Sequence, residues 1–127
     1  MTMSVNPVVW FEIYVSDMER AKRFYEAVFQ KPLARLDAPD PEIEMWTFPM
    51  EQNGPGAAGA LCKMKGFGPS AGGTLIYFQC EDCAVEEARV VNAGGRVEKP
   101  KQSIGQYGAI SIVWDSEGNL IGLHSMK

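Results

Sequence analysis

Glu12, Cys62, Tyr77 and His124 are side chains capable of acid, base or ligand chemistry, and all lie in strand-like sequence. A carboxylate and an imidazole exchange protons near neutral pH, and His124 is the only histidine of the chain. Carboxylate, thiolate and imidazole are also ligands that zinc accepts in tetrahedral sites. These residue types therefore indicate either acid–base catalysis or metal binding.

The other two cysteines, Cys80 and Cys83, form a C-x-x-C pair. Such a pair can be redox-active or supply half of a zinc site, but the sequence has no second pair. The total of three cysteines is an odd number, which is unlike a disulfide framework. We expect ordinary reduced thiols.

The reactive residues are positioned by a unit that opens with residues 8–15, VVWFEIYV, a predicted strand. Ser16 and Glu19 match a capping box, which predicts a helix start. The positions that recur at helical spacing, and that we expect to be buried, are Met18, Ala21, Phe24, Tyr25 and Val28. Three further strands are predicted in LARLD, EIEMWTFPM and AAGALCKM.

The same order returns after the loop KGFGPSAGG, which we interpret as a connector or a flap. TLIYFQC is a predicted strand, Asp82 a predicted helix cap, and Val85, Ala88 and Val91 the apolar positions of that helix. The last three predicted strands are RVEKPKQ, GAISIVW and NLIGLHSM, with DSEGN as a hairpin turn. The sequence thus predicts an α+β fold with two βαβββ units, residues 8–64 and 73–126, in a single domain of residues 1–127.

The two halves can be aligned through Asp17 and Asp82, which are 65 residues apart. This alignment makes Trp10 equivalent to Leu75 and Glu12 equivalent to Tyr77. Towards the ends of the halves, AGALCKM aligns with LIGLHSM, so that Ala60 matches Gly122 and Cys62 matches His124.

The stretch VSDMERAKRFYEAVF and the terminal DSEGNLIGLH resemble the vicinal oxygen chelate superfamily, which includes glyoxalase I, bleomycin-resistance proteins and extradiol dioxygenases. The resemblance covers residues 8–126 and is nearest to the glyoxalase-like branch. It implies two units whose mixed strands form a cup with the helices outside, and a homodimer. It also implies a divalent metal ion that polarises vicinal oxygens of a substrate.

The resemblance places the usual metal ligands on the first and last strand of each unit. In this sequence those positions hold Trp10 and Leu75, then Ala60 or a neighbour, and Gly122. None of these side chains can bind a divalent ion, so we expect the usual metal site to be absent.

Residues two apart on a strand share a face, so Glu12, Cys62, Tyr77 and His124 should point the same way as the vacant positions. One hypothesis is a displaced metal site made of Glu12, Cys62 and His124. The other is a metal-free polar pocket in which Glu12 and His124 are the catalytic base and acid. The plain alternative for each residue is a structural or solvated side chain.

Aromatic residues are the predicted ligand-binding surface. The resemblance assigns Trp10 and Tyr77 to the cup, and we expect Trp46 and Phe48 to face it as well. An aromatic cup suits a flat or apolar small molecule. The alternative is that these rings form the core between sheet and helices.

Composition narrows the classes of function. The net charge of −4 and scattered basic residues disfavour nucleic-acid binding, and no apolar run suggests a membrane span. The start MTMSVNPVVW lacks a secretory signal pattern, so we expect a cytoplasmic protein.

We therefore expect a small-molecule-binding protein of the glyoxalase-like kind, with lyase, isomerase or dioxygenase-type activity as one hypothesis. The alternative is a non-catalytic protein that sequesters a drug or metabolite, as bleomycin-resistance proteins do. A third hypothesis is an interaction module whose sheet edges serve only for dimerisation.

Overall fold

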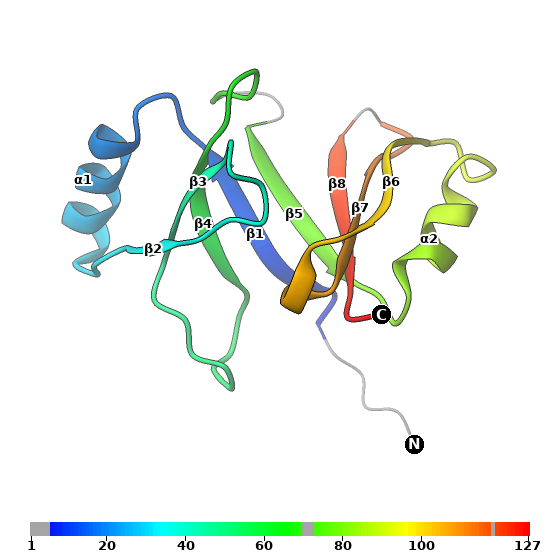
Figure 1. The fold of residues 1–127 in the computed structure, drawn as a ribbon, viewed down its shortest axis with the longest axis horizontal. Helices are drawn as coiled ribbons and strands as arrows, with labels where there is room; N and C mark the ends of the chain where they lie inside the picture. Colours follow the sequence, from blue (N-terminus) through cyan, green and yellow to red (C-terminus); the bar gives the residue numbers. More distant parts are fainter. Residues whose placement is uncertain (1–5, 70–72, 118) are drawn as a thin grey trace. The chain divides into compact units, whose positions relative to one another are not determined.

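The computed structural model describes residues 6–69, 73–117 and 119–127 (Figure 1). Over these residues the element order is β1 (Val8–Tyr14), α1 (Met18–Phe29), β2 (Ala34–Leu36), β3 (Glu44–Thr47), β4 (Ala58–Lys63), β5 (Thr74–Gln79), α2 (Cys83–Val90), β6 (Arg96–Ser103), the 3-10 helix η1 (Gly105–Tyr107), β7 (Ala109–Trp114) and β8 (Leu120–Ser125). The predicted α+β fold with two βαβββ repeats is confirmed. The start of the chain, part of the loop after β4 and Gly118 of the predicted hairpin turn lie outside the described residues.

The chain divides into two compact units, Trp10–Leu75 and Met1–Val9 together with Ile76–Lys127. We call them the N-terminal unit and the C-terminal unit and describe each by itself. Their boundaries fall inside β1 and β5, close to the predicted repeat boundaries. In the C-terminal unit the carbonyl of Pro7 accepts a hydrogen bond from the backbone N–H of Gln79 at 2.8 Å, which ties the start of the chain to β5.

The two units have the same strand connectivity. In the N-terminal unit β4 pairs in parallel with β1 and antiparallel with β3, which pairs with β2. In the C-terminal unit β8 pairs in parallel with β5 and antiparallel with β7, which pairs with β6.

The strand register confirms the predicted alignment of the halves. Glu12 lies opposite Ala60 on the neighbouring strand, and Tyr77 lies opposite Gly122. One step further along, Tyr14 lies opposite Cys62, and Gln79 lies opposite His124. Ala60 and Gly122, where the resemblance expects ligands, therefore have equivalent positions in the two units.

The start of α1 differs by one residue from the prediction. Asp17, not Ser16, is the N-cap, and its carboxylate accepts a hydrogen bond from the Arg20 backbone N–H at 3.0 Å. The Ser16 hydroxyl instead accepts a hydrogen bond from the Arg20 guanidinium. Asp82 caps α2 as predicted, accepting from the backbone N–H of Ala84 at 3.0 Å.

The buried faces of the helices also differ in part from the prediction. In α1, Met18 is buried, but Phe24 and Val28 are 59% and 54% exposed because they lie on the flank of the helix. In α2, Val85 and Val91 are largely exposed, whereas Cys83 and Val90 pack inward. Apolar residues at helical spacing therefore do not all belong to the buried stripe.

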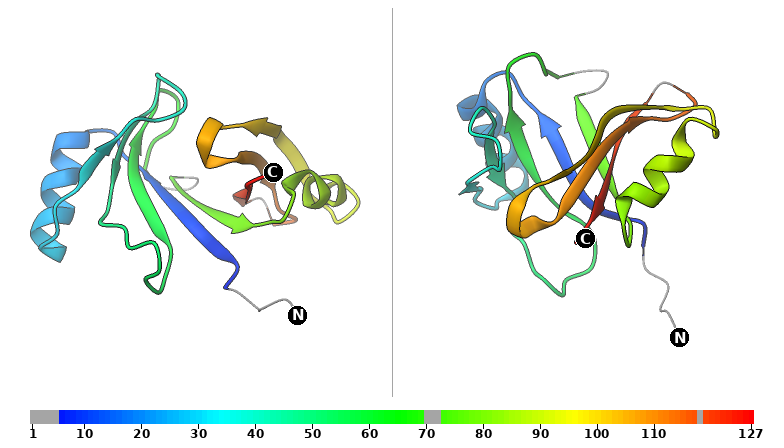
Figure 2. Two further views of the ribbon diagram at one scale, coloured as in Figure 1. Left: turned by 60° about the horizontal axis from the view of Figure 1, so that its bottom comes forward. Right: turned by 45° about the vertical axis from the view of Figure 1, so that its right-hand side comes forward.

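Each helix packs against the strands of its own unit (Figure 2). The core of the N-terminal unit contains Val15, Met18, Leu33 and Leu61. The core of the C-terminal unit contains Cys80, Cys83, Ala109, Val113 and Leu123. Over the described residues, neither helix has the length and apolarity required to cross a bilayer.

Candidate functional site

The carboxylate of Glu12 lies on the face of the N-terminal sheet that is opposite α1. Ile13 packs with the α1 core, so its neighbours Glu12 and Tyr14 point to the other side of β1. The register adds Ala60 and Cys62 of β4 to the same side. We call this surface the Glu12 face.

Both oxygens of Glu12 are held by aromatic donors. The Trp10 indole Nε1 donates to Oε2 at 3.1 Å, and the Tyr14 hydroxyl donates to Oε1 at 2.8 Å. Glu12 is only 8% exposed, whereas Trp10 is half-buried. Donors that meet a carboxylate make stronger bonds than those between neutral groups, so the carboxylate has a fixed position in largely apolar surroundings.

Cys62 lies opposite Tyr14 on β4, on the same side of the sheet as the Glu12 carboxylate. The thiol is fully buried, and its burial raises its pKa well above the usual range, with the nearby charge of Glu12 adding to the rise. Cys62 is therefore a neutral thiol at physiological pH. Binding a metal through its sulfur would require loss of that proton.

In the C-terminal unit the position equivalent to Glu12 holds an aromatic residue, Tyr77. Tyr77 is 5% exposed and lies over Gly122, where any Cβ would overlap the ring of Tyr77. Glycine at position 122 thus leaves room for the phenol of the neighbouring strand. Where the resemblance expects a metal ligand, this unit holds a packed ring.

His124 lies on the same side of the C-terminal sheet as Gly122 and is half-buried. Its Nε2 lies 2.6 Å from the backbone carbonyl oxygen of Tyr107. Because a carbonyl oxygen can only accept, Nε2 carries the proton in this contact. The imidazole is therefore anchored to the segment around η1.

The predicted acid–base pair and the displaced metal site both combine residues of different units. Glu12 and Cys62 belong to the N-terminal unit, and His124 belongs to the C-terminal unit. Both ideas stay predictions. Within each unit, over the described residues, no three side chains of His, Cys, Asp or Glu are grouped so that they could hold a metal ion.

Trp46 and Phe48 lie on the α1 side of the N-terminal sheet, not on the side where we expected them. Both pack against the N-terminal core, and the Phe48 ring is 5.6 Å from that of Tyr25 in α1. Met45 and Thr47 occupy the opposite side. The placement of Trp46 and Phe48 is thus corrected, and the pair is not carried into the proposed site.

The C-x-x-C cysteines are part of the C-terminal core. Cys80 and Cys83 are both buried free thiols in one apolar cluster. Burial raises the pKa of Cys80 to about 11, and the neighbouring Glu86 carboxylate contributes to the rise. A protonated, buried thiol is a poor nucleophile, which agrees with a packing role.

Sequence reasoning missed two features of the site region. Tyr14 is the second donor to Glu12, and its spacing of two residues along the strand was the available signal. The other feature is a pattern among the tryptophans: the indoles of Trp10, Trp46 and Trp114 donate to Glu12, Glu44 and Glu98, respectively. Each indole N–H therefore reports on one carboxylate.

A family model described as the Glyoxalase/Bleomycin resistance protein/Dioxygenase superfamily matches residues 7–123. The chain belongs to this superfamily. No curated protein matches its sequence significantly.

Solved structures with the same fold include methylmalonyl-CoA epimerases. The enzyme from Mycobacterium tuberculosis has a TM-score of 0.65 at 17% identity, with 95% of this chain and 88% of that chain covered. A variant of the Streptomyces coelicolor enzyme, in complex with 2-nitronate-propionyl-CoA, has a TM-score of 0.65 at 18% identity, with 96% and 98% covered. An uncharacterized protein from Methanosarcina mazei has a TM-score of 0.60 at 15% identity, with 98% and 95% covered. At such identities the likeness establishes the glyoxalase-like fold.

Proposed function

We propose that the protein binds a small organic molecule at the Glu12 face, with the Glu12 carboxylate as its polar anchor. The observation that carries this proposal is the pair of hydrogen bonds from Trp10 and Tyr14 to a carboxylate that is 8% exposed. Burying a charge is costly, and such groups occur preferentially at functional sites.

The surroundings of Glu12 favour a ligand with a flat or apolar body. Tyr14 packs against Phe67 with ring centroids 5.5 Å apart, and Ala60 opposite Glu12 adds no polar group. Trp10 is partly accessible, so we infer that a ligand approaches the carboxylate past the indole. A few fixed polar groups among apolar ones are typical of small-molecule sites.

A second candidate is catalysis of proton transfer by Glu12. A fixed carboxylate can take a proton from a carbon next to a carbonyl group, a step that an epimerase requires. Methylmalonyl-CoA epimerases have the same fold, and one of their structures holds methylmalonyl-CoA. Sequestration without chemistry is the alternative, and the missing ligands at Trp10, Leu75, Ala60 and Gly122 favour it.

The test follows the three indole N–H signals by NMR while methylmalonyl-CoA, the hemithioacetal of methylglyoxal and glutathione, or catechol is added. We expect at least one compound to shift the Trp10 signal saturably while the Trp114 signal stays unchanged. In Glu12→Gln binding should weaken at least about tenfold, as expected for loss of a charged contact.

Glu98→Gln is the matched control, because Glu98 accepts the same kind of bond from the Trp114 indole in the C-terminal unit. Equal affinities of Glu12→Gln and the unchanged protein, or no Trp10 shift with any compound, would overturn the proposal. Deuterium exchange into bound ligand in D₂O separates catalysis from sequestration, because only a catalyst accelerates it.

A further inference from the structure

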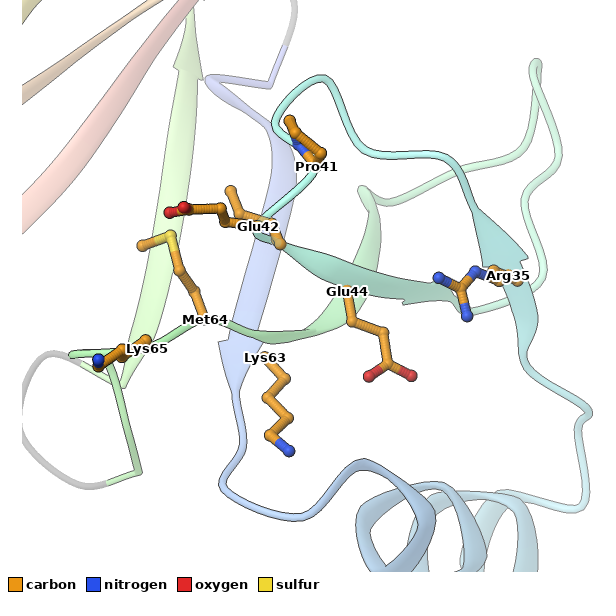
Figure 3. Close-up of a pocket in the computed structure, with 8 residues that line it drawn as sticks. Arg35, Pro41, Glu42, Glu44, Lys63, Met64 and Lys65 are labelled. Atoms are coloured by element: carbon orange, nitrogen blue, oxygen red, sulfur yellow. The ribbon is translucent and has the colours of Figure 1, made fainter.

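A depression of about 260 Å³ lies at one end of the N-terminal sheet (Figure 3). Charged residues of both signs dominate its lining, namely Arg35, Glu42, Glu44, Lys63 and Lys65. The volume suits a molecule of the size of an amino acid.

The central charged residues lie on three adjacent strands. Arg35 is on β2, Glu44 on β3 and Lys63 on β4, and Glu44 lies directly opposite Lys63. Figure 3 shows the Glu44 carboxylate directed into the space between the Arg35 and Lys63 side chains. The side chains of this row are on the α1 side of the sheet, opposite to that of Glu12.

Glu44 has a fixed position in this row. Its Oε2 accepts a hydrogen bond from the Trp46 indole at 2.9 Å, and Glu44 is half-buried. The Lys22 ammonium lies 3.2 Å from the centre of the Trp46 ring, which holds the indole from the helix side. The carboxylate is therefore presented to the depression by an ordered partner.

The opposite charges of the depression do not form ion pairs with one another. Among the described residues the ion pairs within 4.0 Å use Glu19, Glu81 and Asp82 as acids, and none joins two of the five charged lining residues. Cations and carboxylates that share a depression without closing on each other remain available to a ligand.

We propose that this depression binds a small zwitterion, such as an α-amino acid. The ligand carboxylate meets Arg35 and Lys63, because a guanidinium fork matches a carboxylate in two parallel hydrogen bonds. The ligand ammonium meets Glu44. A simple anion would be repelled by the two glutamates, and a simple cation by the three basic residues.

The test uses glycine as the probe and compares it with N-acetylglycine, which has only the carboxylate, and glycinamide, which has only the ammonium group. Glycine should shift the Trp46 indole N–H signal saturably, with a dissociation constant of about 1 mM. The two singly charged analogues should bind at least about tenfold more weakly, because each loses one charged contact.

Glu44→Gln and Arg35→Gln should each weaken glycine binding about tenfold or more, since each removes one charged partner. The matched controls Glu51→Gln and Arg23→Gln remove exposed charges outside the depression and should leave binding unchanged. Glu44→Gln retains an acceptor for the Trp46 indole, so its fold can be checked by circular dichroism.

Equal binding of glycine and either analogue, or no saturable shift of the Trp46 signal, would overturn the proposal. The result is independent of the Glu12 face, because Glu12→Gln should leave glycine binding unchanged. A Trp10 shift with one of the compounds added to test the Glu12 face, together with no Trp46 shift on adding glycine, would support the proposed function while contradicting the zwitterion site.

Discussion

The N-terminal and C-terminal units place different chemistry at equivalent positions. Glu12 lies opposite Ala60, with Trp10 and Tyr14 as donors to its carboxylate. Tyr77 lies opposite Gly122, and the residues equivalent to the two donors are Leu75 and Gln79. The same backbone register thus supports a fixed charge in one unit and a packed ring in the other: an indole and a phenol donate to the charge in the first, and glycine leaves space for the ring in the second.

The largest effect is expected from placing a carboxylate in the C-terminal unit. Tyr77→Glu removes a buried ring and leaves a charge without the indole and phenol donors of Glu12, so unfolding free energy should fall by about 4 kcal/mol. Denaturant titration measures this loss. Tyr77→Phe, which keeps the ring, should lose about 1 kcal/mol or less. A Tyr77→Glu protein as stable as Tyr77→Phe would show that the C-terminal unit accepts a buried carboxylate as well as the N-terminal unit does.

A smaller loss is expected when the space beside Tyr77 is closed. Gly122→Ala brings a Cβ into the Tyr77 ring and should lower the unfolding free energy by about 2 kcal/mol. Gly68→Ala, whose new Cβ would meet no atom within 4 Å, is the control and should change stability by less than about 0.5 kcal/mol. In a Tyr77→Ala background the cost of Gly122→Ala should largely vanish, and an unchanged cost there would contradict the packing account.

Loss of the charge in the N-terminal unit should cost little stability. Glu12→Gln keeps an amide that can bond Trp10 and Tyr14 while it removes a buried charge, so unfolding free energy should change by about 1 kcal/mol or less. Thermal unfolding together with the ligand titration measures both consequences. A loss of stability above about 2 kcal/mol would identify Glu12 as a structural residue rather than a site residue.

The smallest expected effect on unfolding free energy comes from removing the carboxylates of the two helix caps, Asp17 and Asp82, and it is seen as the pH falls. The pKa of Asp17 is lowered by the Arg20 backbone N–H, and the pKa of Asp82 is lowered first by the Lys101 ammonium and then by the Ala84 backbone N–H. A lowered folded-state pKa stabilises the fold above the ordinary value of 3.8, and this stabilisation is lost as the pH falls through the lower value.

Unfolding measured at about pH 6 and about pH 3 should therefore show a smaller loss of stability for Asp82→Asn than for the unchanged protein. Asp17→Asn should behave in the same way with a smaller difference, because Asp17 lacks a partner like the Lys101 ammonium, which bonds Asp82 at 2.8 Å. If the unfolding free energy of all three proteins changed equally with pH, the two cap carboxylates would contribute nothing to the loss of stability at acid pH.

Much of the fold could be predicted because strand and helix periods are local properties. The β-rich stretches VVWFEIYV and TLIYFQC, each followed closely by an Asp at the junction with a helix, were enough to predict the repeat and the alignment of its halves. It was harder to predict which of two neighbouring residues caps a helix when both side chains can do so. Ser16 and Asp17 can both cap a helix, and only the backbone conformation decides that Asp17 does.

The site could be predicted only in part, because the phase of a strand relative to its helix depends on tertiary packing. In β3 both alternating sets contain apolar residues, so the sequence did not reveal that Trp46 packs towards α1 while Met45 points away. The same limit applies to Phe24, whose helical spacing suggested burial. Glu12 could be singled out because it shares a strand face with the expected ligand position, whereas its hydrogen bonds from Trp10 and Tyr14 were found only in the structure.

The overlap between position 122 and Tyr77 also constrains how this lineage can change. A glutamate at position 122, like any residue larger than glycine, would need a Cβ in space that the phenol ring fills. Placing a larger side chain there therefore has an order: Tyr77 must first become a smaller residue, and the intermediate carries a cavity in the C-terminal unit. Each substitution alone is expected to lower stability, so a side chain at position 122 depends on a prior change at Tyr77.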